Sequence, residues 1–175
     1  MVAAILACTS LPSLAADTAR RLVTRADAPG TPGTRHALNL PAATNLVDDA
    51  RASGRERVPI LLFFDRGDCP YCEQALREYL VPMSRDANWR SRAIFRQVEI
   101  DQAHALVDFD GVPTTHRAFA QRHRVRFTPT IHFVGARGDA LAEPLVGLMP
   151  DFYSAYLEQR LEGARAKLQA VGTQR

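Results

Sequence analysis

Cysteine is scarce in this sequence. Among its 175 residues there are three cysteines, and these are Cys8, Cys69 and Cys72. Cys8 lies in an apolar N-terminal stretch, so loss of that stretch would leave one pair. A single pair is not the disulfide framework of a cysteine-rich secreted domain, and it is therefore free for chemistry.

Two further absences narrow the function. Structural zinc needs about four ligands, and no second cysteine pair or suitably spaced histidine pair accompanies Cys69 and Cys72. We therefore expect no metal, and no motif calls for another cofactor. Lys167 is the only lysine, and the arginines are scattered rather than gathered in a basic tract. Nucleic-acid binding is accordingly not expected.

The N-terminus predicts export. Residues 1–16 carry no charge and end in the small residues that a signal peptidase requires, before Asp17 begins a polar segment. The stretch is too short to span a membrane, although no Lys or Arg follows Met1. A competing interpretation is a lipoprotein cleavage box at Ile5–Cys8, which would place a lipid anchor on Cys8. Residues 17–41, rich in Pro and Gly, are predicted to form an irregular leader.

The segment Phe63–Cys72 is the most informative one. It indicates an apolar strand, a turn, and then two cysteines, two residues apart, at the start of a helix. Cys-x-x-Cys in that setting is a redox signature. Cys69 faces the helix N-terminus, where free N–H groups and the helix dipole favour a thiolate. A thiolate is the species that attacks disulfides.

The remaining pattern predicts one α/β domain over residues 42–175. We expect a helix to end at Gly54 and the cysteine helix to stop at Pro82. The interval 101–113 is predicted to be a connection, and a final helix should begin near Asp151. The expected helices cover residues 42–53, 72–81, 114–124 and 151–168, and the expected strands 58–64, 93–100, 130–134 and 141–146. This order predicts a mixed sheet of about four strands with helices on both faces.

Two segments together resemble the thioredoxin superfamily. One is Phe63–Cys72, and the other is Val125–Thr130, which contains the dipeptide Thr128-Pro129. With Asp108–Gly111, they are similar more narrowly to the periplasmic thioredoxin-like proteins linked to sulfur oxidation, the SoxW type. The resemblance implies a thioredoxin fold over about residues 40–168 and a periplasmic thiol–disulfide oxidoreductase.

The resemblance also implies site residues. Cys69 would be the attacking thiolate, Cys72 the resolving thiol, and Pro129 a cis-proline lying against them. Thr128 would pair with the substrate chain like an added strand, and Pro70 and Tyr71 would contact the partner and tune the potential.

One position departs from the family pattern. Many thioredoxins have a buried aspartate six residues before the first cysteine, where this chain has Phe63. Asp65, Asp68 and Glu73 are the nearby alternatives as proton acceptor for Cys72, with Asp68 expected to point to solvent.

The direction of the redox chemistry remains open among reductase, oxidase and isomerase. The short interval between Cys72 and Pro129 leaves no room for the helical insertion of DsbA-type oxidases, and residues 17–41 are too few for a dimerisation domain. These features favour a monomeric reductase. Its implied partners are protein disulfides, such as those of sulfur-oxidation or cytochrome-maturation proteins, and a membrane thiol carrier that supplies electrons. A redox-inert binding module is the alternative from another class.

Overall fold

The computed structural model describes residues 39–172, with side chains up to Ala170. The predicted signal peptide, Cys8 and the leader up to residue 38 lie outside these residues. Leu40 and Pro41, assigned above to the leader, pack beside the sheet. Leu40 is buried, and the carbonyl of Pro41 accepts a hydrogen bond from the N–H of Gln97.

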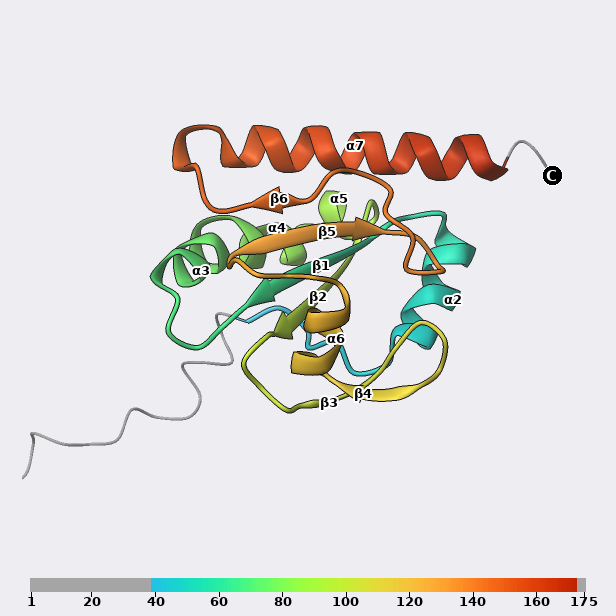
Figure 1. The fold of residues 1–175 in the computed structure, drawn as a ribbon. Helices are drawn as coiled ribbons and strands as arrows, with labels where there is room; N and C mark the ends of the chain where they lie inside the picture. The colour runs from blue at the N-terminus through green and yellow to red at the C-terminus, as the bar shows by residue number, and fades with distance from the viewer. Residues whose placement is uncertain (1–38, 173–175) are drawn as a thin grey trace, which may run out of the picture. The chain divides into compact units, whose positions relative to one another are not determined.

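A mixed four-stranded sheet forms the centre of the domain (Figure 1). The strand order is β2-β1-β5-β6, with β1 parallel to β2 and antiparallel to β5, and with β6 antiparallel to β5. The strands are β1 (Ile60–Asp65), β2 (Ile94–Glu99), β5 (Thr130–Val134) and β6 (Leu145–Val146). The predicted α/β fold with a mixed sheet is confirmed.

Helices cover both faces of this sheet (Figure 1). One core cluster joins Leu61 and Phe63 of β1 to the cysteine helix and the C-terminal helix. The other joins Leu62 and Phe64 to two further helices, one that precedes β1 and one that precedes β5. The first face is covered by α3 (Pro70–Ala75), η1 (Leu76–Leu80), α4 (Val81–Arg85) and α7 (Tyr153–Gly172), and the second by α2 (Leu46–Glu56) and α6 (His116–Arg122). The shorter α5 (Ala87–Arg90) and η2 (Pro150–Phe152) connect elements.

Alternation along β1 explains why all six of its residues are buried. Successive side chains point to opposite faces, and each face has its own helical layer. An uninterrupted apolar run is what such a strand requires. The C-terminal helix α7 shows the complementary helical pattern, because Tyr153, Leu157, Leu161 and Ala164 form one buried stripe and Leu168 packs against it.

Pro82 does not end the cysteine helix, contrary to prediction. The helix passes through the π-helical turn η1 and continues as α4, in which Pro82 lies in the first turn. The N–H of Val81 bonds to the carbonyl of Leu76, five residues back. The wider turn accommodates a proline that has no N–H to donate and whose ring would crowd a regular α-helix.

Two other helix ends were predicted wrongly. Gly54 lies within α2, which ends at Glu56 and is capped by Arg57 in the left-handed conformation with φ 53°. Asp151 lies in the 3₁₀ turn η2, and α7 begins at Tyr153.

The interval 101–113, predicted to be a plain connection, contains a strand. In it β3 (Ala105–Val107) pairs antiparallel with β4 (Pro113–Thr115) as a separate two-stranded sheet. The next helix, α6, begins at His116 because the hydroxyl of Thr115 caps it, accepting the N–H of Ala118 at 3.2 Å.

The strand predicted over residues 141–146 returns antiparallel to β5, but it is shorter than expected. Val134 bridges to Ala140, and regular pairing resumes only in β6. Gly138 occupies the turn with φ 74°, where a β-carbon would meet the ring of Phe109. No helix of the described chain is long and apolar enough to cross a bilayer.

Candidate active site

Cys69 and Cys72 are joined by a disulfide with an S–S distance of 2.05 Å. Cys69 is the N-cap of α3, and its Sγ accepts a hydrogen bond from the N–H of Cys72 at 3.1 Å. Pro70 occupies the first turn, where a proline loses no helical hydrogen bond. When the pair is reduced, the same N–H would favour negative charge on the sulfur of Cys69.

The two cysteine residues differ in exposure. Cys69 retains 6% of its surface exposed and Cys72 only 1%. Both belong to the core cluster that contains Phe63. A partner disulfide therefore reaches Cys69 before Cys72. The burial supports the order of attack that the resemblance implies.

The Thr128–Pro129 loop lies against this disulfide. The peptide bond between the two residues is cis, as the resemblance implied. The Thr128 hydroxyl lies 3.6 Å from the Sγ of Cys69, within reach of a weak hydrogen bond to sulfur. The carbonyl of Pro129 accepts the N–H of Gly147, which ties the loop to the segment after β6.

The backbone of Thr128 is available for pairing. Within residues 39–172, its N–H and C=O form no hydrogen bond with another part of the chain. An extended segment beside the loop could take both groups, as in strand addition to a sheet edge.

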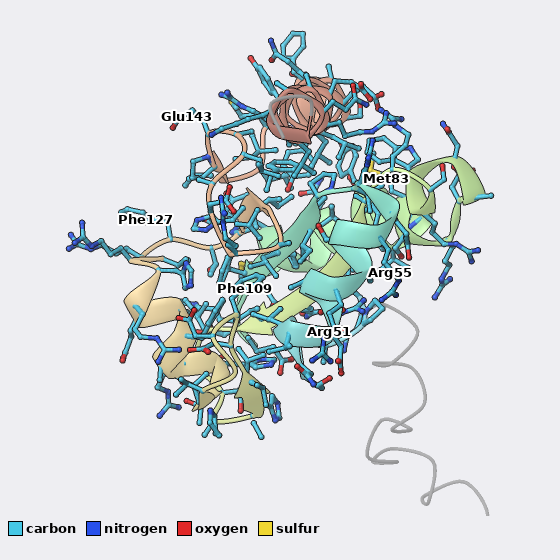
Figure 2. The ribbon with its side chains drawn as sticks, turned by 90° about the vertical axis from the view of Figure 1, so that its right-hand side faces the viewer. Arg51, Arg55, Met83, Phe109, Phe127 and Glu143 are labelled. Carbon is cyan, nitrogen blue, oxygen red and sulfur yellow. A yellow bond between two sulfur atoms is a disulfide. The ribbon has the colours of Figure 1, made fainter. Side chains whose placement is uncertain are left out.

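Exposed apolar side chains occur on the segments that border the disulfide. Tyr71 is 64% exposed and Phe127 71%, and Val146 and Met149 are each about half exposed. Figure 2 shows the Phe127 ring at the outer edge of the α6–β5 connection, directed away from the sheet. Of these four residues, the sequence indicated only Tyr71 as a contact for the partner. Exposure of an apolar side chain depends on the tertiary fold, and no local pattern signals it.

A buried carboxylate ends β1 on the same face as Phe63. Asp65 is 6% exposed, and its Oδ2 accepts a hydrogen bond of 2.7 Å from the side-chain amide of Gln97. Its Oδ1 is buried without any hydrogen-bond partner. Gln97 in turn accepts the N–H of Leu40 through its side-chain oxygen. A buried polar atom without a partner is uncommon and calls for an explanation.

The surroundings of Asp65 favour its protonated form. Burial raises the pKa of Asp65 to about 7, and the negative charges of Glu99 and Asp101 add to the effect. The bond from Gln97 works in the opposite direction. Asp101 also accepts the N–H of Gly67 at 3.3 Å, which links this acidic group to the loop before Cys69. A carboxyl group that titrates near neutrality suits proton transfer.

The other two candidate acids are placed differently. The side chain of Asp68 is 79% exposed and pairs with Arg66 at 2.8 Å, so it points to solvent as predicted. Glu73 lies exposed in the first turn of α3. Arg77, one turn further along the helix, contacts Glu78 and not Glu73. Neither acid shares the buried environment of Asp65.

The histidines within residues 39–172 have contacts with groups other than the disulfide, and His104 lies 2.8 Å from the carboxylate of Glu99. His116 is buried and satisfied, since its Nε2 lies 2.8 Å from the carbonyl of Ala43 and its Nδ1 accepts the N–H of Glu99. His123 and His132 pack with aromatic rings on the other face of the sheet. In the described part of the chain, no three His, Cys, Asp or Glu side chains gather as a metal site would require.

The sequence matches the thioredoxin-like domain over residues 46–161. The chain belongs to the thioredoxin-like family. The matched range includes the cysteine pair and the Thr128–Pro129 loop, and the thioredoxin fold is the feature shared with the family. No match was found among curated proteins, and the narrower SoxW-type resemblance stays a prediction.

Solved structures of the same fold are distant in sequence. The DsbH oxidoreductase is 16% identical, with a TM-score of 0.50, covering 82% of this chain and 98% of its own. A thioredoxin from Thermus thermophilus is 21% identical, with a TM-score of 0.47, covering 76% and 94%. A thioredoxin-fold protein from Helicobacter pylori is 20% identical, with a TM-score of 0.45, covering 67% and 86%. At these identities the likeness concerns the fold.

Proposed function

We propose that the protein is an exported thiol–disulfide oxidoreductase that reduces disulfides in partner proteins. One observation carries the proposal. The sulfur of Cys69, the more exposed of the two cysteine residues, lies at a helix N-terminus between the N–H of Cys72 and the hydroxyl of Thr128. Two hydrogen-bond donors directed at one sulfur stabilise its thiolate, which is the attacking form.

The proposed reaction has two exchange steps. The Cys69 thiolate attacks one sulfur of a partner disulfide, forming a mixed disulfide and releasing the other partner sulfur as a thiolate. Cys72 then loses its proton and attacks Sγ of Cys69. This forms the Cys69–Cys72 disulfide and releases the second partner thiolate. The partner gains two electrons and, after protonation, two protons, while the protein becomes oxidised.

The buried carboxylate of Asp65 is proposed to accept the proton of Cys72. It is the buried candidate acid, on the sheet face covered by the cysteine helix. Its unpartnered Oδ1 leaves a lone pair available, and a pKa of about 7 lets it both take up and release a proton near neutral pH. Asp68 and Glu73 are solvated and face the outside of the domain.

Thr128 and its neighbours are proposed to hold the partner. The free N–H and C=O of Thr128 would pair with an extended segment, while Tyr71, Phe127 and Val146 offer apolar contacts beside it. Pro129, with its carbonyl fixed by Gly147, keeps the pairing groups of Thr128 at the sulfur.

The compartment and direction complete the proposal. Export to the periplasm rests on the sequence of residues 1–16, and reduction rests on the absence of an oxidase-type insertion between Cys72 and Pro129. Since such a compartment is oxidising, the protein would draw electrons from a dithiol carrier in the membrane.

An insulin-reduction assay with dithiothreitol as donor tests the activity. We expect turnover by the wild type, none by Cys69→Ser, and little by Cys72→Ser. Incubated with insulin after removal of dithiothreitol, the pre-reduced Cys72→Ser variant should accumulate a mixed disulfide on Cys69, which mass spectrometry detects and added reductant removes. If the wild type and Cys69→Ser are equally inactive, the protein is a redox-inert binding module.

The proton acceptor has a separate test with matched variants. Asp65→Asn keeps the shape and the hydrogen bond to Gln97 but removes the acid. We expect it to slow resolution of the mixed disulfide about tenfold or more near neutral pH, within the usual range for general base catalysis. It should also remove the corresponding step from the pH profile. Asp68→Asn and Glu73→Gln are the controls. If either slows resolution more than Asp65→Asn does, that residue and not Asp65 is the proton acceptor.

A further inference from the structure

Resting on the proposed function, we propose that the preferred partner carries acidic side chains close to its reactive cysteine. Arg124 and Arg126 would bind these acids, beside the apolar contact made by Phe127. The inference names the chemistry of the substrate segment, which the redox mechanism leaves open.

The loop before the cis-proline holds two arginines outward. Its inner residue, Val125, packs against the core cluster of α2 and α6, and its N–H bonds to the carbonyl of Ala120 at 3.0 Å. Arg124 is held by a bond to the carbonyl of Gln121 and adopts the left-handed conformation with φ 56°. With Val125 fixed inward, Arg124 and Arg126 on either side of it are exposed.

Within the described residues 39–172, these two arginines form no salt bridge with an acidic side chain, and the salt bridges there belong to other basic residues. The neighbouring Arg122 differs, because it pairs with Asp108 at 2.7 Å. On the opposite side of the disulfide, Arg66 is paired with Asp68. The cis-proline loop therefore carries two positive charges that no acidic side chain of the described residues neutralises. On the α3 side of the disulfide the exposed Glu73 is negative, so the attraction proposed for an acidic partner is confined to the cis-proline loop.

The two arginines lie close in the chain to Thr128, where the partner is proposed to pair. The Thr128 hydroxyl lies 3.6 Å from the sulfur that is attacked. Two residues span at most about 7 Å even when fully extended, so the backbone of Arg126 lies within about that distance of Thr128. A partner segment that pairs with Thr128 and continues along the loop would bring an acidic side chain close to Arg126. Arg124 lies two residues further from Thr128, in the turn that follows α6.

The exposed apolar side chains near the disulfide determine which further residues the partner segment should carry. Phe127 and Tyr71 are the most exposed large apolar side chains of the described chain. Val146 is half exposed and directly precedes Gly147, whose N–H bonds to the carbonyl of Pro129. A matching segment places apolar residues next to its cysteine and acids beyond them. Opposite charge across an interface raises association rates and selects partners more than it adds affinity.

Disulfide peptides that differ only in flanking charge test the inference. Three peptides of equal length would hold the same intrachain disulfide with flanking Asp, Asn or Lys residues. The rate constant for reduction by the reduced protein is measured for each and divided by the rate with dithiothreitol, which removes intrinsic reactivity. Hydroxyethyl disulfide, small and uncharged, reports the basic exchange activity.

For the wild type at low salt, we expect the normalised rate to fall in the order Asp, Asn, Lys, with about a tenfold span. The span should shrink towards one in about 1 M salt, where charges are screened beyond about 3 Å. The double variant R124E/R126E should reverse the order and leave hydroxyethyl disulfide unaffected. The control R51E/R55E makes the same change in net charge on α2, away from Phe127 in Figure 2, and should keep the wild-type order.

Two results would overturn this inference and leave the proposed function intact. One is equal normalised rates for the three peptides in an active wild type. The other is the same effect in R51E/R55E as in R124E/R126E, which would assign it to net charge. A wild type that reduces neither the peptides nor hydroxyethyl disulfide would instead overturn the proposed function, and the inference with it.

Discussion

The carboxylate of Asp65 accepts a hydrogen bond of 2.7 Å from the amide of Gln97 on the adjacent parallel strand. Both side chains are buried. The pair places an ionisable group behind the cysteine helix and satisfies one of its two oxygens, leaving the other without a partner. A carboxylate held in this way destabilises the folded state when it is charged.

Removal of the Asp65 charge should therefore stabilise the protein at alkaline pH. The folded pKa of about 7 is raised above the unfolded value of 3.8. The stabilisation associated with the neutral form is complete below pH 3.8 and is lost as the pH rises through 7. At pH 8, Asp65→Asn should increase the free energy of unfolding by on the order of 2 kcal/mol. Denaturant titration of the oxidised protein measures this, and a gain that is equal at pH 4 and pH 8 contradicts it.

His132 should produce the opposite pH dependence. Its pKa is lowered from 6.5 to about 4, chiefly by burial and further by nearby His123. Stability is then complete above pH 6.5 and falls as the pH drops, because only the unfolded chain binds the proton. Between pH 6.5 and 4, the free energy of unfolding should therefore fall by on the order of 1–2 kcal/mol less in His132→Gln than in the wild type. The comparison variant is His104→Gln, and an equal acid loss in wild type and His132→Gln would refute the assignment.

The Thr128 hydroxyl should influence the reactivity of Cys69. Thr128→Val keeps the shape of the side chain and removes the donor that lies 3.6 Å from Sγ. The thiolate fraction of reduced Cys69 at a given pH should fall, and alkylation by iodoacetamide below neutral pH should slow about threefold, for a weak bond to a charged acceptor. Thr114→Val, on β4, is the control. An unchanged alkylation profile would show that the contact does not stabilise the thiolate.

Two glycines should respond to alanine in opposite directions. Gly138 has φ 74°, and an added β-carbon would lie 2.7 Å from the ring of Phe109. Gly54 lies in α2 with nothing within 4 Å. Gly138→Ala should lower the free energy of unfolding by about 1–3 kcal/mol, whereas Gly54→Ala should raise it by about 0.5–1 kcal/mol. Thermal unfolding of both variants checks the pair, and equal shifts would contradict the account.

The sequence predicted the parts of the fold that depend on strong local patterns. The apolar run of β1, the cysteines at a helix start and the stripe from Tyr153 to Leu168 each correspond to one element. Pro82 was misjudged because a π-helical turn removes the conflict that normally stops a helix. The short strands β3 and β4 were missed because three residues each give too little alternation to detect.

The candidate site was predictable as far as its residue types determine chemistry. Cys69, Cys72 and Thr128–Pro129 are brought together as the resemblance implied. The sequence could not decide which of Asp65, Asp68 and Glu73 is the buried candidate proton acceptor. That depends on which carboxylate the tertiary fold buries, and on the hydrogen bond that Asp65 receives from Gln97, which is distant in the sequence. The exposure of Phe127 likewise follows from tertiary packing.

The redox potential of the Cys69–Cys72 pair tests the central claim most directly. It is obtained by equilibrating the protein with glutathione mixtures and measuring the oxidised fraction by mass spectrometry. A reductase should have a potential towards the thioredoxin end of the range, below about −220 mV. A value near about −120 mV, at the oxidising end, would contradict the account and assign the protein to disulfide formation.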